Sequence, residues 1–128
     1  MLLDLDGDGD LDIVTNDYGV GPQVLTSDLA QQGAVHSVTV RLVGRRSNRD
    51  GLGAVVTVRA GGRAQVQVQD GKSGYLAQSA LPLYFGLGAA ARVDAITVRW
   101  PSGATQVIRG PIRSGTAVVV EERQGPGS

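Results

Sequence analysis

Five aspartates occupy every second position of a nine-residue segment near the start of the sequence. They are Asp4, Asp6, Asp8, Asp10 and Asp12, and glycines stand between several of them. Carboxylates this close together repel one another, and a hard cation with oxygen ligands offsets that repulsion. The segment therefore predicts a Ca²⁺ loop, with Asp4, Asp6, Asp8 and Asp12 as side-chain ligands. The carbonyl of Asp10 and water would complete about six or seven oxygens.

The flanking residues exclude an EF-hand, the commonest calcium loop with a similar start. Counted from Asp4, the twelfth position is Thr15, where an EF-hand has a bidentate Glu. The run Ile13-Val14-Thr15 is β-branched, which favours a strand over the helix that an EF-hand needs. We therefore expect the loop to lead into a β-hairpin.

Composition and charge limit the class of protein. The 128 residues make about one domain, and the 19 glycines with no cysteine favour many tight turns without disulfides. Residues 1–30 carry seven acids and no base, so the net charge of this part is −7 and that of residues 31–128 is +7, in a chain that is neutral as a whole. The bases are almost all arginines, scattered without a basic stripe of interleaved stacking aromatics, so we expect no nucleic-acid partner. No apolar run could span a membrane, and we expect no signal peptide within this chain.

The pattern of apolar residues predicts an all-β chain in two parts. We expect residues 1–30 to form a hairpin, with strands at 11–15 and 23–26 around a turn at 16–22, and residues 27–33 to form a linker. Alternating β-branched residues predict about seven strands in residues 34–123, arranged as an antiparallel β-sandwich. Residues 124–128 are expected to be a flexible tail.

Three local patterns within the sandwich make sharper predictions. In the run 64–69, Ala64, Val66 and Val68 are expected to face the core and the glutamines to face water. The pair Gly61-Gly62 predicts a two-residue hairpin turn. The sequence Trp-Pro-Ser-Gly at 100–103 predicts another tight turn.

The acidic segment is similar to a known repeat. Asp-x-Asp-x-Asp-Gly-x-x-Asp before an apolar strand resembles the FG-GAP (VCBS-type) calcium loop of β-propellers, in which the ion ties together the hairpin of a blade. The resemblance implies Asp4, Asp6, Asp8, Asp12 and the Asp10 carbonyl as ligands. The chain carries one partial copy, so residues 1–30 would be a propeller-blade remnant.

Residues 36–122 resemble the ASPIC/UnbV domain found at the C-terminus of bacterial secreted propeller proteins and of cartilage acidic protein. The likeness is carried by Ser-Asn-Arg-Asp-Gly-Leu-Gly-Ala at 47–54, Gly-Tyr-Leu-Ala-Gln-Ser at 74–79, Leu-Tyr-Phe-Gly-Leu-Gly at 83–88 and Val-Arg-Trp-Pro-Ser-Gly at 98–103. This family implies a secreted, cell-surface or periplasmic protein that serves interaction or adhesion, not a reaction.

Two loops of the predicted sandwich are candidates for a ligand site. One carries Asn48, Arg49 and Asp50, and the other carries Lys72, Tyr75 and Gln78; together they would offer a polar surface to a glycan or protein. The alternative is that the first is only a shaped hairpin loop, in which Asn or Asp caps its own backbone. Some remaining residues are expected to be structural: Leu83, Phe85 and Leu87 in the core, Trp100 as a core or edge anchor, and His36 on the surface.

The sequence is compatible with three functions. The leading one is a calcium-stabilised binding module that is not an enzyme. The second is a structural cap for the remainder of a larger propeller. The third is a hydrolase, which would need His36 in a Ser-His-Asp arrangement or a carboxylate pair drawn from Asp50, Asp70 and Asp94.

Overall fold

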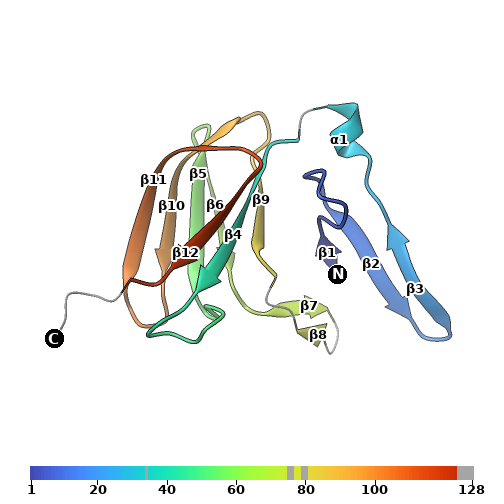
Figure 1. Ribbon diagram of the computed structural model, residues 1–128, viewed down its shortest axis with the longest axis horizontal. Helices are drawn as coiled ribbons and strands as arrows, with labels where there is room; N and C mark the ends of the chain where they lie inside the picture. The colour runs from blue at the N-terminus through green and yellow to red at the C-terminus, as the bar shows by residue number, and fades with distance from the viewer. Residues whose placement is uncertain (34, 75–76, 79–80, 124–128) are drawn as a thin grey trace.

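The computed structural model describes residues 1–33, 35–74, 77–78 and 81–123, and nearly all of its regular structure is strand (Figure 1). The tail expected at 124–128 lies outside the described residues. The N-terminal elements are β1 (Leu2–Leu3), β2 (Asp12–Asp17), β3 (Val20–Leu25) and α1 (Leu29–Gln32). The elements that follow are β4 (Ser37–Val43), β5 (Val55–Ala60), β6 (Arg63–Val68), β7 (Lys72–Gly74), β8 (Ala77–Gln78), β9 (Leu83–Gly86), β10 (Arg92–Arg99), β11 (Thr105–Arg113) and β12 (Thr116–Glu121).

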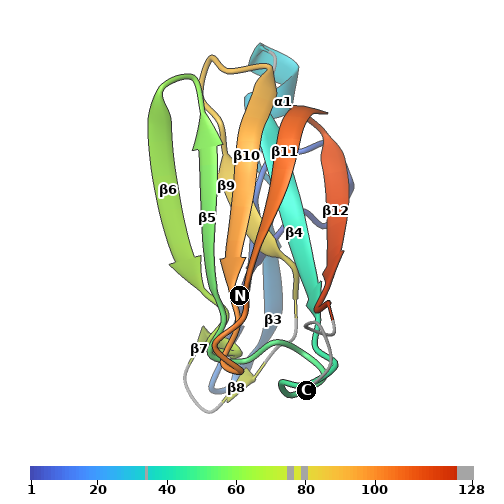
Figure 2. The ribbon, with the colours of Figure 1, turned by 90° about the vertical axis from the view of Figure 1, so that its left-hand side faces the viewer.

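Seven of these strands form the predicted β-sandwich. One sheet has the order β11-β10-β5-β6 and the other the order β12-β4-β9, and the two lie face to face (Figures 1 and 2). Neighbouring strands are antiparallel except β12 and β4, which pair in parallel from Thr116↔Val38 to Glu121↔Val43. The all-β sandwich is confirmed, and the parallel pair is a feature that residue alternation does not reveal.

The core of the sandwich is made by alternate residues of both sheets. Its fully buried members are mostly valines, with three larger residues: Phe85, Ile96 and Trp100. Burying each such side chain contributes about 1.5–3 kcal/mol. The prediction that Phe85, Leu87 and Trp100 are core residues is confirmed, and Leu83 is half-buried against them.

The prediction for β6 is wrong, because its two faces are reversed. Val66 and Val68 are 60% and 51% exposed, whereas the glutamines face the second sheet. Gln65 Nε2 donates to the carbonyl of Gly86 at 2.5 Å and Gln67 Nε2 to that of Tyr84 at 2.6 Å. Both β6 and β9 are edge strands, so the carbonyls of β9 need donors that no further strand supplies. The register of β6 on β5 sets this orientation, because Gln65 and Gln67 are the partners of the buried Val58 and Val56 and so lie on the same face of the sheet.

A glutamine side chain also bonds to the backbone of the facing sheet on the other side of the sandwich. Gln106 on β11 donates to the carbonyl of Glu121 and accepts a hydrogen bond from the N–H of Arg123, both at 3.0 Å. Each side of the sandwich therefore has glutamine side chains joined to the backbone of the facing sheet.

The two predicted tight turns are confirmed. Gly61 and Gly62 have φ of 55° and 76°, which the turn between β5 and β6 requires. At the other turn, the N–H of Gly103 donates to the carbonyl of Trp100 at 2.9 Å.

The N-terminal residues form a separate sheet with the order β1-β2-β3. Its hairpin is longer than predicted, because β2 runs to Asp17 and β3 starts at Val20, leaving a tight turn at Tyr18-Gly19. Pro22 lies within β3, which is tolerated because β3 is an edge strand. The expected linker contains the short helix α1. No helix among the described residues is long and apolar enough to cross a membrane.

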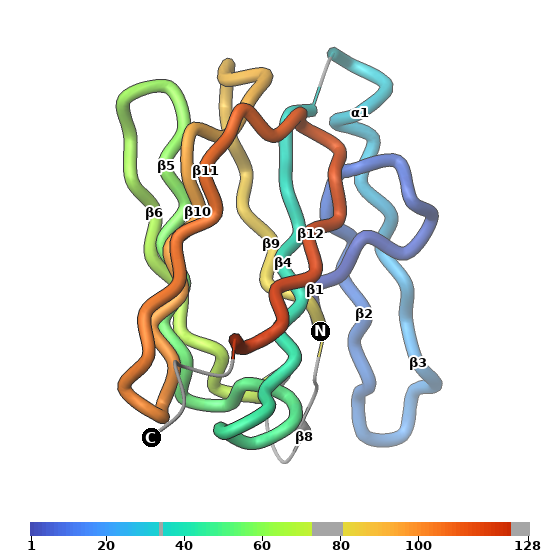
Figure 3. The backbone as a smooth tube through the Cα atoms, turned by 60° about the vertical axis from the view of Figure 1, so that its left-hand side comes forward, coloured from blue at the N-terminus to red at the C-terminus, as the bar shows by residue number. Residues whose placement is uncertain are grey.

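The chain thus stacks three layers: the four-stranded sheet, the three-stranded sheet and the N-terminal sheet (Figure 3). The acidic loop at residues 4–12 and the helix α1 lie on the side of the three-stranded sheet.

Candidate functional site

The acidic loop brings three of the five predicted ligand residues together. Carboxylate oxygens of Asp4, Asp6 and Asp8 all lie within 4.8 Å of one another. The loop curls around Asp4, whose two oxygens accept hydrogen bonds from the N–H groups of Gly7 at 2.7 Å and Gly9 at 3.1 Å. This arrangement presents three carboxylates to a single point at the surface.

The cluster is electrostatically unfavourable without a counter-charge. The N–H of Asp10 lowers the pKa of Asp8, but desolvation and the charges of Asp10, Asp6 and Asp4 outweigh it, so the pKa of Asp8 is raised. After desolvation, the repulsion from these three neighbouring carboxylates contributes to the raised pKa. A bound cation would reverse that balance.

Asp10 and Asp12 lie deeper and organise the backbone. The two oxygens of Asp12 accept hydrogen bonds from the N–H groups of Ser27 and Leu5, both at 2.9 Å. Chiefly the Ser27 bond, followed by those of Leu5 and Asp6, lowers the pKa of Asp12 against the opposing effect of burial. Oδ2 of Asp10 accepts from the N–H of Ala30 in α1 at 2.9 Å, and its Oδ1 is buried without a partner among the described residues. The part of these two residues in metal ligation remains a prediction.

Hydrogen bonds join the acidic loop to the sandwich at the carbonyl of Gly9. The carbonyl of Gly9 accepts hydrogen bonds from Tyr84 Oη on β9 at 2.6 Å and from Ser37 Oγ on β4 at 3.3 Å. Both residues belong to the outer face of the three-stranded sheet, since their neighbours Val38 and Phe85 are in the core. The acidic loop therefore helps to hold the N-terminal sheet against the sandwich.

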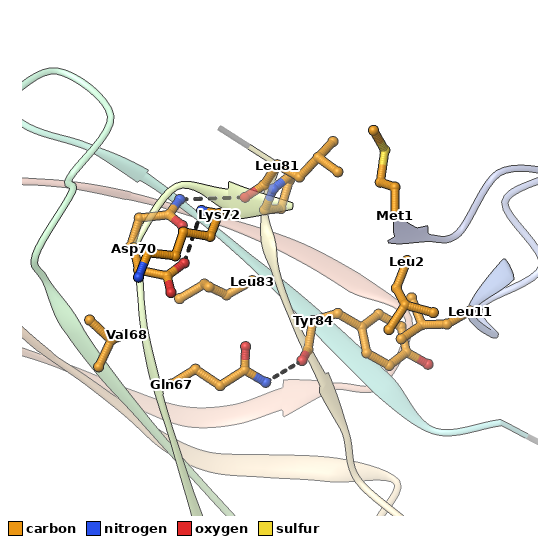
Figure 4. Close-up of a pocket in the computed structure, with 12 residues that line it drawn as sticks. Met1, Leu2, Leu11, Gln67, Val68, Asp70, Lys72, Leu81, Leu83 and Tyr84 are labelled. Atoms are coloured by element: carbon orange, nitrogen blue, oxygen red, sulfur yellow. Dashed lines mark hydrogen bonds between the residues drawn. The ribbon is translucent and has the colours of Figure 1, made fainter. Parts of the chain in front are cut away.

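A groove of about 560 Å³ opens beside this junction. Leu2 and Leu11 lie on one side of it, with the side chain of Tyr84 extending toward them, and Gln67 and Asp70 lie on the other (Figure 4). Lys72, one of the predicted ligand residues, lines the same groove, and its N–H donates to Asp70 Oδ1 at 3.0 Å.

The first predicted ligand loop, residues 44–54, has a defined internal structure. Asn48 donates through Nδ2 to the carbonyl of Leu52 and accepts through Oδ1 from the N–H of the same residue, both at 2.7 Å. Asn48 therefore shapes the loop by bonding to its backbone, which was the alternative to a direct role in ligand binding. A Cβ at Gly51, whose φ is 67°, would lie 2.8 Å from Cβ of Leu42, so the loop is seated directly on the core. Arg49 projects from it with a 90% exposed side chain, its Nε 3.8 Å from Asp50 Oδ1.

A buried carboxylate that the sequence did not single out holds this loop in place. Glu122 Oε2 accepts hydrogen bonds from three successive N–H groups, those of Arg45, Arg46 and Ser47, each at 2.8 Å. Its Oε1 accepts from the hydroxyls of Ser47 at 2.9 Å and Ser102 at 2.5 Å. Successive N–H groups form an anion-binding nest, and here the anion comes from the chain itself.

These donors set the ionisation of Glu122. Burial raises its pKa, but the hydroxyl of Ser102 and the N–H groups of Ser47, Arg45 and Arg46 outweigh burial and lower the pKa from 4.5 to about 2. Glu122 is therefore ionised throughout the physiological range. Its partners on the loop lie 75 to 77 residues earlier in the chain and Ser102 lies 20 residues earlier, so no local pattern could have identified it.

The two predicted ligand loops lie at the same end of the sandwich (Figures 1 and 2). A backbone hydrogen bond joins them, from the N–H of Gly53 to the carbonyl of Gln69 at 2.7 Å. Lys72 and Gln78 pair across β7 and β8, and Tyr75 lies outside the described residues. His36, expected at the surface, is partly buried, with Nδ1 3.0 Å from Ser114 Oγ.

Comparison with known families identifies a match to most of the β-sandwich, including the loop at residues 44–54. A sequence model of the family described as ASPIC and UnbV matches residues 44–126, from the start of the Arg45–Ala54 loop to beyond Glu122. The match does not extend to the acidic loop. No curated protein matches the chain.

We predict that replacing Glu122 with Gln destabilises the fold and removes a pH dependence. Because the folded-state pKa is depressed, the ionised carboxylate stabilises the fold above pH 4.5, and this contribution is lost as the pH falls toward 2. Near neutral pH the substitution should cost about 2–4 kcal/mol, since an amide gives weaker acceptors and places an NH₂ among donors. Urea denaturation of both proteins between pH 7 and pH 2 measures the difference, which should shrink at low pH.

Glu121→Gln is the matched control. Glu121 is exposed and forms a salt bridge with Arg45, so its loss should cost at most about 1 kcal/mol. If the two variants lose equal stability, the carboxylate of Glu122 is not the anchor of the loop.

Proposed function

The chain belongs to the ASPIC and UnbV family, and we propose that it is a calcium-stabilised binding or adhesion module of an extracellular or periplasmic protein, without catalytic activity. We further propose that residues 1–30 are a partial FG-GAP (VCBS-type) repeat. The observation that carries the calcium part is the convergence of Asp4, Asp6 and Asp8 within 4.8 Å.

The residues present fit a hard cation. Ca²⁺ prefers carboxylate and carbonyl oxygens, and residues 1–30 hold seven acids without a base to neutralise them. Asp4, Asp6 and Asp8 would hold the ion, with Asp10 and Asp12 as the further predicted ligands. The ion would supply charge neutralisation, and with it a single conformation of the loop.

A fixed loop would have consequences for the rest of the molecule. Gly9 lies within the loop, and its carbonyl is the acceptor for Tyr84 and Ser37 of the sandwich. A metal-ordered loop would therefore hold the N-terminal sheet at a set position and maintain the groove beside Leu2 and Tyr84. This is a structural role for calcium, not a catalytic one.

Recognition is proposed for the end of the sandwich that carries Arg49 and Lys72. Arg49 is exposed, and its distance of 3.8 Å from Asp50 leaves its guanidinium able to meet a ligand. The Glu122 nest and the Asn48 bonds hold the loop rigid, which lowers the entropic cost of binding. A glycan or a protein would suit this polar surface.

A second candidate function, a structural cap on a neighbouring propeller blade, is favoured by the N-terminal sheet. Leu2, Ile13 and Leu25 are direct cross-strand partners, and they are 62%, 41% and 57% exposed. A row of apolar side chains across three strands is a surface that a neighbouring element could cover.

We predict that calcium raises the melting temperature. An ion that binds only the folded state stabilises it by about 2.7 kcal/mol when its free concentration is a hundred times Kd. Thermal unfolding in excess calcium and in chelator measures this gain, which Asp8→Asn should abolish.

Asp17→Asn serves as the control for that experiment, because Asp17 lies outside the cluster and accepts a hydrogen bond from Tyr18. It should keep the calcium response of the unsubstituted chain. Identical melting in calcium and in chelator would show that the calcium proposal is wrong.

We predict that a glycan array probed with the chain gives hits that depend on Arg49. Arg49→Ala should weaken binding at least about tenfold, as expected for a central guanidinium contact. Arg46→Ala, on the same loop, should have little effect, since only its backbone holds Glu122. Hits that survive Arg49→Ala would place recognition elsewhere, and comparison with and without calcium tests the coupling to the acidic loop.

Oligomeric state separates the binding module from the cap. Light scattering after size exclusion should show a monomer if the chain is a self-sufficient module. Association that increases with concentration and is reduced by Leu25→Lys would favour the cap. Val119→Lys, at an exposed position of the sandwich, is the matched control.

A further inference from the structure

The four-stranded sheet carries an excess of positive charge. Its strands β5, β6, β10 and β11 contain six arginines and a single carboxylate, that of Asp94. The three-stranded sheet is balanced, with Arg41 on β4 and Glu121 on β12. Half of the twelve bases of the chain therefore lie in one sheet.

Strand register places several of these arginines on one face. Arg59, Arg99 and Arg109 are exposed and alternate with core residues such as Val58, Val98 and Ile108, so they point away from the core. Figure 2 looks onto this outer face, with β6, β5, β10 and β11 side by side. The N-terminal sheet lies on the opposite side of the sandwich (Figure 1).

The spacing of the three arginines is regular. Arg59 on β5 and Arg109 on β11 are both register partners of Ala95 on β10, so their backbones are about 10 Å apart, two strand spacings. Arg99 lies four residues from Ala95 along β10, about 13 Å. The side chains between them are small or short, as with Thr57 and Thr97 on neighbouring strands. The face is thus a flat surface with separated cations.

A fourth and fifth arginine extend the charge to the end of the sheet. Arg92 and Arg113 are direct cross-strand partners and both are exposed. Like charges directly opposite each other are unfavourable, and a bound anion would relieve them. Asp94 at the adjacent bulge offsets only one of these charges.

None of these arginines has an ion-pair partner among the described residues, where the salt bridges involve Arg45 and Arg49. Their guanidinium groups are free to bind oxyanions such as sulfate in a bidentate manner. The seven acids of residues 1–30 lie behind two sheets, so they are screened from this face at physiological salt, where the Debye length is about 8 Å.

We propose that the outer face of the sheet β11-β10-β5-β6 binds a sulfated polysaccharide. An extended chain with repeated sulfate groups matches cations that are spread over a flat surface. A protein partner is disfavoured because the four strands of this face contain no aromatic residue that could serve as an anchor. Single-stranded nucleic acid is disfavoured because strands β5, β6, β10 and β11 contain no aromatic residue on which bases could stack.

The proposal does not rest on the function proposed for the loop end that carries Arg49, although Arg99 borders that end, since its register partner Val55 directly follows the loop. It adds a ligand class, the sulfated polysaccharide, and a place on the molecule where the contact is electrostatic. Loss of binding at one surface is expected to leave the other unchanged.

The test uses dextran sulfate as the probe, with unsulfated dextran and a DNA single strand of matched charge as comparisons. Calorimetry at physiological salt should show binding of dextran sulfate and none of dextran. The triple variant R59Q/R99Q/R109Q should lose at least tenfold in affinity, and its salt dependence should be shallower. The triple variant R59K/R99K/R109K keeps the charge and should keep most of the affinity, which separates lost contacts from misfolding.

The matched control is R41Q/R46Q/R123Q, which makes the same change in net charge at exposed positions outside this sheet. It should bind dextran sulfate within about twofold of the unsubstituted chain. Equal losses in the two Gln triples, or an absence of binding, would overturn the proposal. DNA binding as tight as that of dextran sulfate would overturn it in favour of a nucleic-acid surface.

Discussion

The structure depends on satisfying the backbone at the open sides of its sandwich. Each of the two sheets has an edge strand on either side: β11 and β6 in the four-stranded sheet, and β12 and β9 in the three-stranded sheet. An edge strand has a row of N–H and C=O groups without strand partners. This chain meets the requirement with side chains. Gln65 and Gln67 serve the carbonyls of β9, and Gln106 serves both kinds of group beside β12. These glutamines join the two sheets by hydrogen bonds in addition to the apolar core.

The same principle explains how the loops are held. Glu122 gathers three N–H groups and two hydroxyls around one buried carboxylate, and Asp12 does the same for Leu5 and Ser27 on a smaller scale. In each case an acidic side chain replaces water as the acceptor for a loop that has no strand partner. These hydrogen bonds hold loops at both ends of the molecule in defined conformations.

Much of the fold could be predicted because it depends on local chemistry. Alternation in β4, β5 and β10 reports burial directly, and Gly61-Gly62 and the turn after Trp100 report backbone conformation. The prediction failed at β6, where Val66 and Val68 alternate with glutamine as clearly as any strand. Its orientation follows from its register on β5, where Gln65 and Gln67 are the partners of the buried Val58 and Val56, and the carbonyls of β9, about twenty residues away, accept hydrogen bonds from both glutamines. Propensity carries no information about such contacts. The parallel pairing of β12 with β4 and the role of Glu122 were beyond prediction for the same reason.

The candidate sites also differ in whether they depend on residues close together in the sequence or on contacts between distant segments. The convergence of Asp4, Asp6 and Asp8 could be expected from their spacing in a single loop, whereas the attachment of Gly9 to Tyr84 and Ser37 is a contact across 75 and 28 residues. Arginines that look scattered in the sequence lie on one face of the sheet. Arg59, Arg99 and Arg109 each directly follow a core-facing residue of their strand, so all three side chains point away from the core. The fold therefore separates the charges of a neutral chain, with acids at the N-terminal loop and arginines on the far sheet. At physiological salt each surface is screened from the other, so a cation at one and a polyanion at the other would be bound by one molecule without competition.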